Sequence, residues 1–224
     1  MELQDADKKA KALLEDVLVD LLYSKYKDLV FHGGTAIWRC YGGNRFSRDL
    51  DFYFNAKSKS PGECNKELSD FFKSREFSLK KRSYNRDTKT MQFLVQARGK
   101  MKVDINLGYK SGSPADYTRA DGSKSTVLAL TPIEILNEKI DAYSDKLSNQ
   151  GAIKQPEAHD LYDIFYLTGI IKEKDDPTAL RLGELLERIG VNQPPDIRGL
   201  GNLIISGVAP SFEFMIESIK LWMK

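Results

Sequence analysis

Two neighbouring stretches carry the clearest information about the fold of this chain, Leu29-Val-Phe-His-Gly-Gly-Thr35 and Arg45-Phe-Ser-Arg-Asp-Leu-Asp-Phe-Tyr-Phe54. The first segment predicts a short apolar strand that ends in a tight turn at Gly33-Gly34, followed by a short helix. In the second segment apolar and polar side chains alternate, as they do on a strand with one buried face. The polar face of that strand carries Asp49 and Asp51, so two carboxylates are expected side by side.

Hydrophobic periodicity predicts helices and strands on both sides of this stretch. A helix is expected over 8–26, and the capping box Ser60-Pro-Gly-Glu63 predicts the start of another. Further strands are expected at 77–80, 91–97 and 101–107, and further helices at 131–147, 157–171, 177–189 and 211–223, with a loop at 148–156. The order of elements predicts an α/β module over residues 1–129 and a helical module over 130–224.

Composition excludes several classes of protein. With 224 residues, 41% hydrophobic and 29% charged, the chain is neither collagen-like nor disordered nor a coiled coil. Lys and Arg (34) nearly balance Asp and Glu (32), so a polyanion site must come from a local patch. Two cysteines and two histidines argue against a disulfide framework or a zinc site of Cys and His. The sequence shows neither a signal peptide nor a membrane-spanning stretch, which indicates a cytoplasmic protein with no membrane partner.

A third carboxylate, Asp104, is expected on the polar face of the strand at 101–107. If that strand lies beside the one bearing Asp49 and Asp51, three carboxylates share a face, and hard cations are needed to offset their repulsion. Mg²⁺ binds through a few carboxylates together with phosphate oxygens, the arrangement used in two-metal nucleotidyl transfer. A glycine turn lets backbone N–H groups approach nucleotide phosphates, with Thr35 as a hydroxyl donor.

Four segments together resemble a known family. His32-Gly-Gly-Thr-Ala-Ile-Trp-Arg39 and Arg45-Phe-Ser-Arg-Asp-Leu-Asp-Phe52 look like the first motif of the AbiEii/AbiGii toxin nucleotidyltransferases, within the DNA polymerase β-like superfamily. Leu130-Thr-Pro-Ile-Glu-Ile-Leu-Asn-Glu-Lys-Ile-Asp-Ala142 and His159-Asp-Leu-Tyr-Asp163 resemble the family's later helical segments. The chain departs from the family at His159, where an arginine is common, and in the longer loop at 148–156.

The resemblance implies an α+β fold of the polymerase β-like nucleotidyltransferase type, a mixed sheet with flanking helices, in which residues 130–224 complete the active-site cleft. It implies an NTP, ATP included, and Mg²⁺ as cofactors, with Lys139 and Asp160 as further functional residues. The expected catalytic residues are Asp49, Asp51, Asp104, Lys139 and Asp160, the first three also as metal ligands. The expected nucleotide contacts are Gly33, Gly34, Thr35, Arg48 and Lys139.

For several of these residues a purely structural role is an alternative to a role in catalysis or binding. Lys139 is either an ammonium on triphosphate oxygens or a surface lysine paired with a carboxylate. Asp160 and Asp163 share a helix face, where they could simply favour the helix N-terminus. Arg45 and Arg48 flank the two aspartates and either clamp phosphates or lie on the surface.

The acceptor of the nucleotide is predicted from a local basic patch. Residues 73–89 hold seven basic residues against two acids, a patch that fits either an RNA backbone or a solvated hairpin. The resemblance implies a toxin that adds nucleotides to tRNA, opposed by an antitoxin, while the wider superfamily modifies proteins or small molecules. The leading hypothesis is a Mg²⁺-dependent nucleotidyltransferase. The alternatives are a non-catalytic nucleotide- or RNA-binding module, or a two-metal phosphohydrolase.

Overall fold

The computed structural model describes residues 5–57, 59–97, 99–148, 155–173, 175–190 and 192–224. These residues form two units, each with its own core. The sheet unit comprises the chain up to Gly42 together with Phe46–Leu130, and the helical unit comprises Gly43–Arg45 and Thr131–Lys224.

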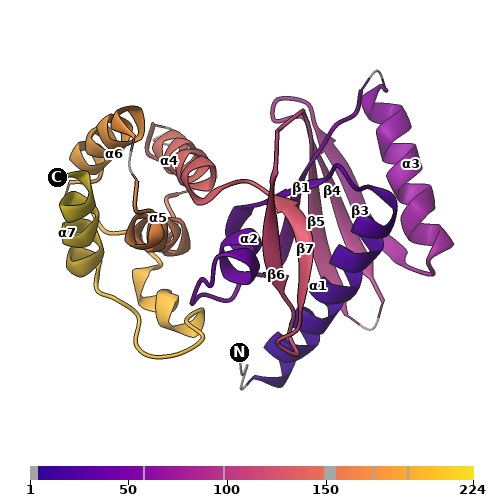
Figure 1. The fold of residues 1–224 in the computed structure, drawn as a ribbon, viewed down its shortest axis with the longest axis horizontal. Helices are drawn as coiled ribbons and strands as arrows, with labels where there is room; N and C mark the ends of the chain where they lie inside the picture. The colour runs from indigo at the N-terminus through magenta and orange to yellow at the C-terminus, as the bar shows by residue number, and fades with distance from the viewer. Residues whose placement is uncertain (1–4, 58, 98, 149–154, 174, 191) are drawn as a thin grey trace. The chain divides into compact units, whose positions relative to one another are not determined.

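The sheet unit is built on a mixed sheet whose described strands lie in the order β3-β4-β5-β2-β1-β7-β6 (Figure 1). They are β1 (Val30–His32), β2 (Asp49–Phe54), β3 (Ser78–Asn85), β4 (Thr90–Gln96), β5 (Lys100–Leu107), β6 (Ser113–Thr118) and β7 (Lys124–Ala129). The pairs β2–β5 and β1–β7 are parallel, and the other pairs are antiparallel. The three strands predicted after residue 76 are confirmed as β3, β4 and β5.

The sheet differs from the prediction at its two edges. Strand β3 continues to Asn85, because an edge strand needs no apolar alternation and its middle is basic and exposed. Strands β6 and β7 were missed, since β6 buries only Tyr117 fully and its other side chains give no period-two pattern. Propensity and periodicity are weakest for such half-exposed strands.

Helices α1 (Ala6–Lys25) and α3 (Pro61–Ser74) cover the apolar face of the sheet. The ring of Phe52 on β2 meets Tyr23 of α1, and Phe93 on β4 meets Phe72 of α3. The predicted capping box at the start of α3 is confirmed, with reciprocal hydrogen bonds between Ser60 and Glu63. The opposite face of β2 and β5 is therefore free to carry polar groups.

Helix α2 (Gly33–Cys40) follows β1 directly, so the predicted turn and short helix are one element. Its last turn holds Arg39, a fully buried arginine that pairs with Glu15 and Asp16 of α1, each at 3.1 Å. The hydroxyl of Tyr117 also donates to Asp16, at 2.9 Å. Burial raises the pKa of Glu15 to about 8, despite the opposing charge of Arg39. This cluster ties α1, α2 and β6 together, and the sequence did not predict it.

The helical unit contains α4 (Pro132–Ser148), α5 (Ala158–Ile170), α6 (Asp176–Ile189), the 3₁₀ helix η1 (Ile197–Asn202) and α7 (Phe212–Met223) (Figure 1). The four helices predicted after residue 130 are confirmed, while most of the predicted loop, at 149–154, lies outside the described residues. Helix α5 packs against both α4 and α7, and its buried side chains form the centre of this core. In the described part of the chain, no helix combines the length and hydrophobicity that a bilayer requires.

Candidate active site

The polar face of β2 and β5 brings the three predicted aspartates together. The strands pair in parallel with Asp51 opposite Asp104 and Asp49 opposite Lys102. Because side chains alternate along a strand, all four point to the face away from α1 and α3. The expectation that Asp104 joins Asp49 and Asp51 from a neighbouring strand is confirmed.

Lys102 is a member of this face that the sequence analysis missed. Its Nζ lies 2.7 Å from Oδ2 of Asp104 and 3.7 Å from Oδ2 of Asp49. Burial alone lowers the pKa of Lys102, but the hydrogen bond and charge of Asp104, with Asp49 and Asp51, raise it overall. The spacing could have indicated this contact, since Lys102 precedes Asp104 by two residues on one strand.

Asp104 is the most buried of the three aspartates. Its Oδ2 accepts hydrogen bonds from Lys102 and from Nε2 of Gln92 on β4, the latter at 3.3 Å. Its Oδ1 is buried and has no hydrogen-bond partner among the described residues. A buried carboxylate oxygen without a partner is costly, which points to a ligand for this atom.

Gly33 lies directly against Asp51. The backbone of Gly33 has a φ of +74°, and a Cβ at this position would come within 2.5 Å of Oδ2 of Asp51. Burial raises the pKa of Asp51, and Asp104 and Asp49 raise it further, while His32 opposes the shift. The glycine therefore leaves room for the carboxylate of Asp51, a role that was not predicted from the sequence.

Thr35 and Gly34 are buried in the first turns of α2. The Thr35 hydroxyl donates to the backbone carbonyl of Asp49 at 2.5 Å, so this side chain holds the start of β2 in place. Its role as a donor to phosphate stays a prediction, and here the donor has a partner within the protein. Arg48 is exposed beside Asp49 in the sequence.

His32 lies at the margin of the carboxylate face, opposite Asp51 in the β1–β2 pair. Its Nε2 is 3.0 Å from Nδ2 of Asn106, whose Oδ1 accepts a hydrogen bond from Thr90. The ring also stacks on Tyr53, with centroids 4.3 Å apart. This agrees with a satisfied histidine rather than a free base.

In the helical unit, Lys139 joins two aspartates of α5. Its Nζ lies 2.9 Å from Oδ1 of Asp160 and 2.8 Å from Oδ2 of Asp163, and its side chain is 14% exposed. Lys146 adds a second ammonium to Asp160, at 2.6 Å. Lys139 is thus paired with carboxylates but is not a surface lysine, and Asp163 does more than favour a helix N-terminus.

Two roles were considered for Arg45, a surface position or a contact with phosphate. In the structure its side chain is buried and its guanidinium is bound to Asp163. Its Nε and Nη2 donate to the two oxygens of Asp163, each at 2.7 Å. This two-point geometry is the strongest form of an arginine–carboxylate pair. Arg45 therefore holds Asp163, which in turn holds Lys139.

The charges of this network hold each group in its ionised form. Burial alone lowers the pKa of Lys139, but Asp163 and Asp160 raise it well above its usual value. Burial alone raises the pKa of Asp160, but Lys139 and the other nearby cations bring it far below its usual range. At neutral pH, Lys139 is an oriented, permanently charged ammonium.

A second group of ligand atoms, from Glu157, His159 and Asp160, lies close enough together to be considered for a metal. Lys146 donates to both carboxylates of this group, at 2.5 and 2.6 Å. Burial also lowers the pKa of His159. This group belongs to the salt-bridge network around Lys139, which shares Asp160 with it. The carboxylate face of the sheet unit suits a divalent cation better, since it offers oxygen ligands and an unpartnered, buried Oδ1 of Asp104.

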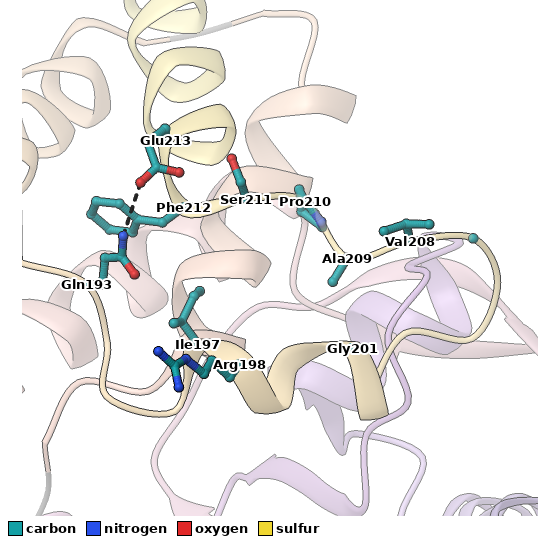
Figure 2. A pocket seen from close by; sticks show the side chains of 11 residues that line it. Gln193, Ile197, Arg198, Gly201, Val208, Ala209, Pro210, Ser211, Phe212 and Glu213 are labelled. Atoms are coloured by element: carbon teal, nitrogen blue, oxygen red, sulfur yellow. Dashed lines mark hydrogen bonds between the residues drawn. The ribbon is translucent and has the colours of Figure 1, made fainter.

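An open hollow of about 510 Å³ lies in the helical unit, between η1 and the segment that runs from Gly207 into the start of α7 (Figure 2). Gln193 on its wall donates to Glu213 at 3.0 Å, and Arg198 contributes the positive charge. None of the predicted site residues lines it. The hollow is therefore not the candidate active site.

Comparisons with known proteins show the family and the fold of this chain. The profile of the family described as "Nucleotidyl transferase AbiEii toxin, Type IV TA system" matches residues 16–202. No curated protein is similar enough in sequence to be matched with this chain.

Two solved structures resemble this one over nearly its whole length. JHP933 from Helicobacter pylori is 19% identical, with a TM-score of 0.63, over 98% of this chain and 91% of that chain. The nucleotidyltransferase toxin MenT4 from Mycobacterium tuberculosis is 19% identical, with a TM-score of 0.61, over 99% of this chain and 85% of that one. At this identity the likeness concerns the fold, and the predicted polymerase β-like nucleotidyltransferase fold is confirmed.

Proposed function

The chain belongs to the AbiEii family of nucleotidyltransferase toxins, and from this membership we propose that it is a magnesium-dependent enzyme that transfers a nucleoside monophosphate from an NTP to a hydroxyl group of RNA, with tRNA as the favoured acceptor. In this reaction the acceptor oxygen bonds to the α-phosphorus and the bond from that phosphorus to the bridging oxygen breaks. Pyrophosphate leaves, and the hydroxyl proton passes to a base.

The observation that carries the proposal is the parallel pairing of β2 and β5. It sets Asp51 opposite Asp104 and Asp49 beside them on one polar face. Three carboxylates on adjacent strands match the ligand needs of Mg²⁺ in phosphoryl transfer. The unpartnered Oδ1 of Asp104 supports the same interpretation.

Each residue then has a stated task. Asp49, Asp51 and Asp104 would hold Mg²⁺, which supplies charge stabilisation for the reacting phosphate. Asp104 also accepts the proton of the acceptor hydroxyl. The backbone amides of Gly33 and Gly34, at the start of α2, are proposed to face the phosphates.

The proposal gives Lys139 and Asp160 a role in binding the triphosphate. Lys139 contributes a permanent positive charge, and Asp160 with Asp163 fixes the direction of its side chain. A charge that is oriented before the reaction stabilises developing negative charge at little reorganisation cost. Contacts of Arg48 and Thr35 with the nucleotide, and the completion of the cleft by residues 130–224, stay predictions.

The basic edge strand supports RNA as the acceptor. Strand β3 and its flanks carry the residues of the basic patch, and the side chains of Lys80, Lys81 and Arg82 are exposed. Basic side chains along an exposed edge suit the phosphate backbone of a nucleic acid, and Tyr84 adds an aromatic ring. We also propose an antitoxin that opposes this activity, and a cytoplasmic location.

A labelling experiment tests the reaction and the acceptor together. The protein is incubated with each α-labelled NTP, Mg²⁺ and either purified tRNA or an RNase-treated cell extract. Label on tRNA that disappears with EDTA and with Asp51→Asn is the expected result. Label in the RNase-treated extract alone would move the acceptor to a protein or small molecule. No label with any NTP would leave the fold as a non-catalytic binding module.

The Lys66→Met variant is the matched control for that experiment. Lys66 lies on α3 and pairs with Asp70 on the exposed surface of the helix. Its substitution should leave labelling unchanged.

A further inference from the structure

Lys102 occupies the place between two of the carboxylates that the proposed function assigns to metal. It lies across the β2–β5 pair from Asp49 and two residues before Asp104 on the same face. Its ammonium is 2.7 Å from Asp104 and 3.7 Å from Asp49, so it bridges carboxylates of two different strands. The ammonium of Lys102 therefore supplies a positive charge among the three aspartates.

The ammonium and a divalent cation compete for the same carboxylates. Lys102 binds Oδ2 of Asp104 and lies near Oδ2 of Asp49, and the proposed function gives both of these aspartates to the metal. Two cations a few ångströms apart repel each other strongly in a partly dry site. Lys102 must then move away before a metal can use both carboxylates.

The structure allows this movement at low cost. The Lys102 side chain is 39% exposed, while that of Asp104 is 12% exposed. A lysine head group on a flexible stem can turn into water without disturbing the apolar face of the sheet. The carboxylate, in contrast, is held by Gln92 and by the strand.

We propose that Lys102 is an internal counter-ion that competes with the divalent cation for Asp104 and Asp49 and so sets the affinity of the free enzyme for metal. The proposal rests on the proposed function, because it takes these aspartates as the metal ligands. In the free enzyme the ammonium relieves carboxylate repulsion and keeps the face folded. When metal binds, the same residue weakens the binding by the free energy needed to displace it.

Binding of Mn²⁺ alone to the nucleotide-free full chain, followed by electron paramagnetic resonance, tests the proposal. Lys102→Met keeps the length of the side chain and removes its charge. Its dissociation constant for Mn²⁺ should be about tenfold lower than that of wild type, since one positive charge next to a divalent ion is gone. The control Lys66→Met makes the same change in net charge on exposed α3 and should bind Mn²⁺ as wild type does. Lys102→Arg retains the charge and should also stay close to wild type.

Thermal unfolding gives a second readout that needs no catalysis. Without metal, Lys102→Met should melt at a lower temperature than wild type, because the carboxylates have lost their counter-ion. Saturating Mn²⁺ should raise its melting temperature more than that of wild type, since a tighter ligand stabilises more. If Lys102→Met is poorly folded without metal, Lys102→Gln takes its place in both measurements.

Three results would overturn the proposal. Equal or weaker Mn²⁺ binding by Lys102→Met, in a wild type that binds Mn²⁺ and transfers nucleotide, contradicts the role of Lys102 alone. Tighter binding by both Lys102→Met and Lys66→Met shows an effect of net charge without competition. No Mn²⁺ binding by wild type or by any variant contradicts the metal site itself, and with it the proposed function.

Discussion

Replacing Gly33 by alanine should disable the enzyme through the position of one carboxylate. A Cβ at Gly33 would lie 2.5 Å from Oδ2 of Asp51 and 3.1 Å from its Cβ and Cγ. A carbon and an oxygen that are not bonded to each other do not come so close, so the Asp51 side chain must move from its present position on β2. A shift of about 1 Å in a catalytic group costs on the order of 10²-fold in rate.

The same substitution also has a backbone cost. With φ at +74°, an alanine at position 33 is in the left-handed region, which costs about 1–2 kcal/mol. In a chain of this length each kcal/mol lowers the melting temperature by about 2–4 °C. Loss of activity by partial unfolding must therefore be separated from loss by displacement of Asp51.

Gly122→Ala is the matched control. Gly122 has a φ of +87°, and nothing lies within 4 Å of a Cβ built on it. An alanine at position 122 therefore has a strained backbone but no clash of its Cβ with a neighbouring atom. The melting temperature of Gly122→Ala should fall while its nucleotide transfer stays near that of wild type.

The assay is transfer of label from an α-labelled NTP at a temperature well below both melting transitions, together with thermal unfolding of each variant. The expected outcome is normal transfer by Gly122→Ala and a loss of about two orders of magnitude by Gly33→Ala. Equal transfer by the two variants, at equal folded fraction, would refute the reasoning that Gly33 is required for the position of Asp51.

Three other substitutions test the remaining parts of the site. Asp51→Asn should abolish transfer yet raise the melting temperature at pH 7. The folded state raises the pKa of Asp51, so wild type loses stability as the pH rises through that pKa. The amide of the variant does not ionise and avoids this loss. Unchanged transfer, or a lower melting temperature at pH 7, would count against the assignment. Lys139→Ala should slow transfer by about 10²-fold and destabilise the chain by about 3 kcal/mol, since it leaves two buried carboxylates short of a cation. Their pKa values lie below the usual range, so their contribution is present at neutral pH and lost on acidification; a melting temperature like that of wild type at pH 7 would contradict the network. Changing Lys80, Lys81 and Arg82 to Glu should reduce the slope of log K against log salt for RNA by about 0.7 to 0.9 per lost phosphate contact, with nucleotide binding retained, and an unchanged slope would assign the patch to solvent.

The sequence predicted the elements with strong local patterns. The alternation at 49–54, the capping box at Ser60 and the long apolar stripes after residue 130 each depend on neighbours within a few residues. The half-exposed strands β6 and β7 were missed, because their conformation follows from pairing with β1 and with each other. Edge strands carry little periodicity of their own.

Sequence alone determined that Asp49 and Asp51 share one face of their strand and that Asp104 lies on the polar face of its own strand, because side-chain alternation is a local property of the backbone. It also determined the family, through motifs that occur in a set order. The partners of these side chains were decided by tertiary structure.

The contact of Lys102 with Asp49 and Asp104 depends on which residues of β2 and β5 lie opposite each other. A shift of one residue would turn every side chain of one strand to the other face. The hold of Arg45 on Asp163 depends likewise on a pairing between residues 118 positions apart. Register and long-range packing arise only when the core closes, and for that reason the counter-ions of the site were not visible in the sequence.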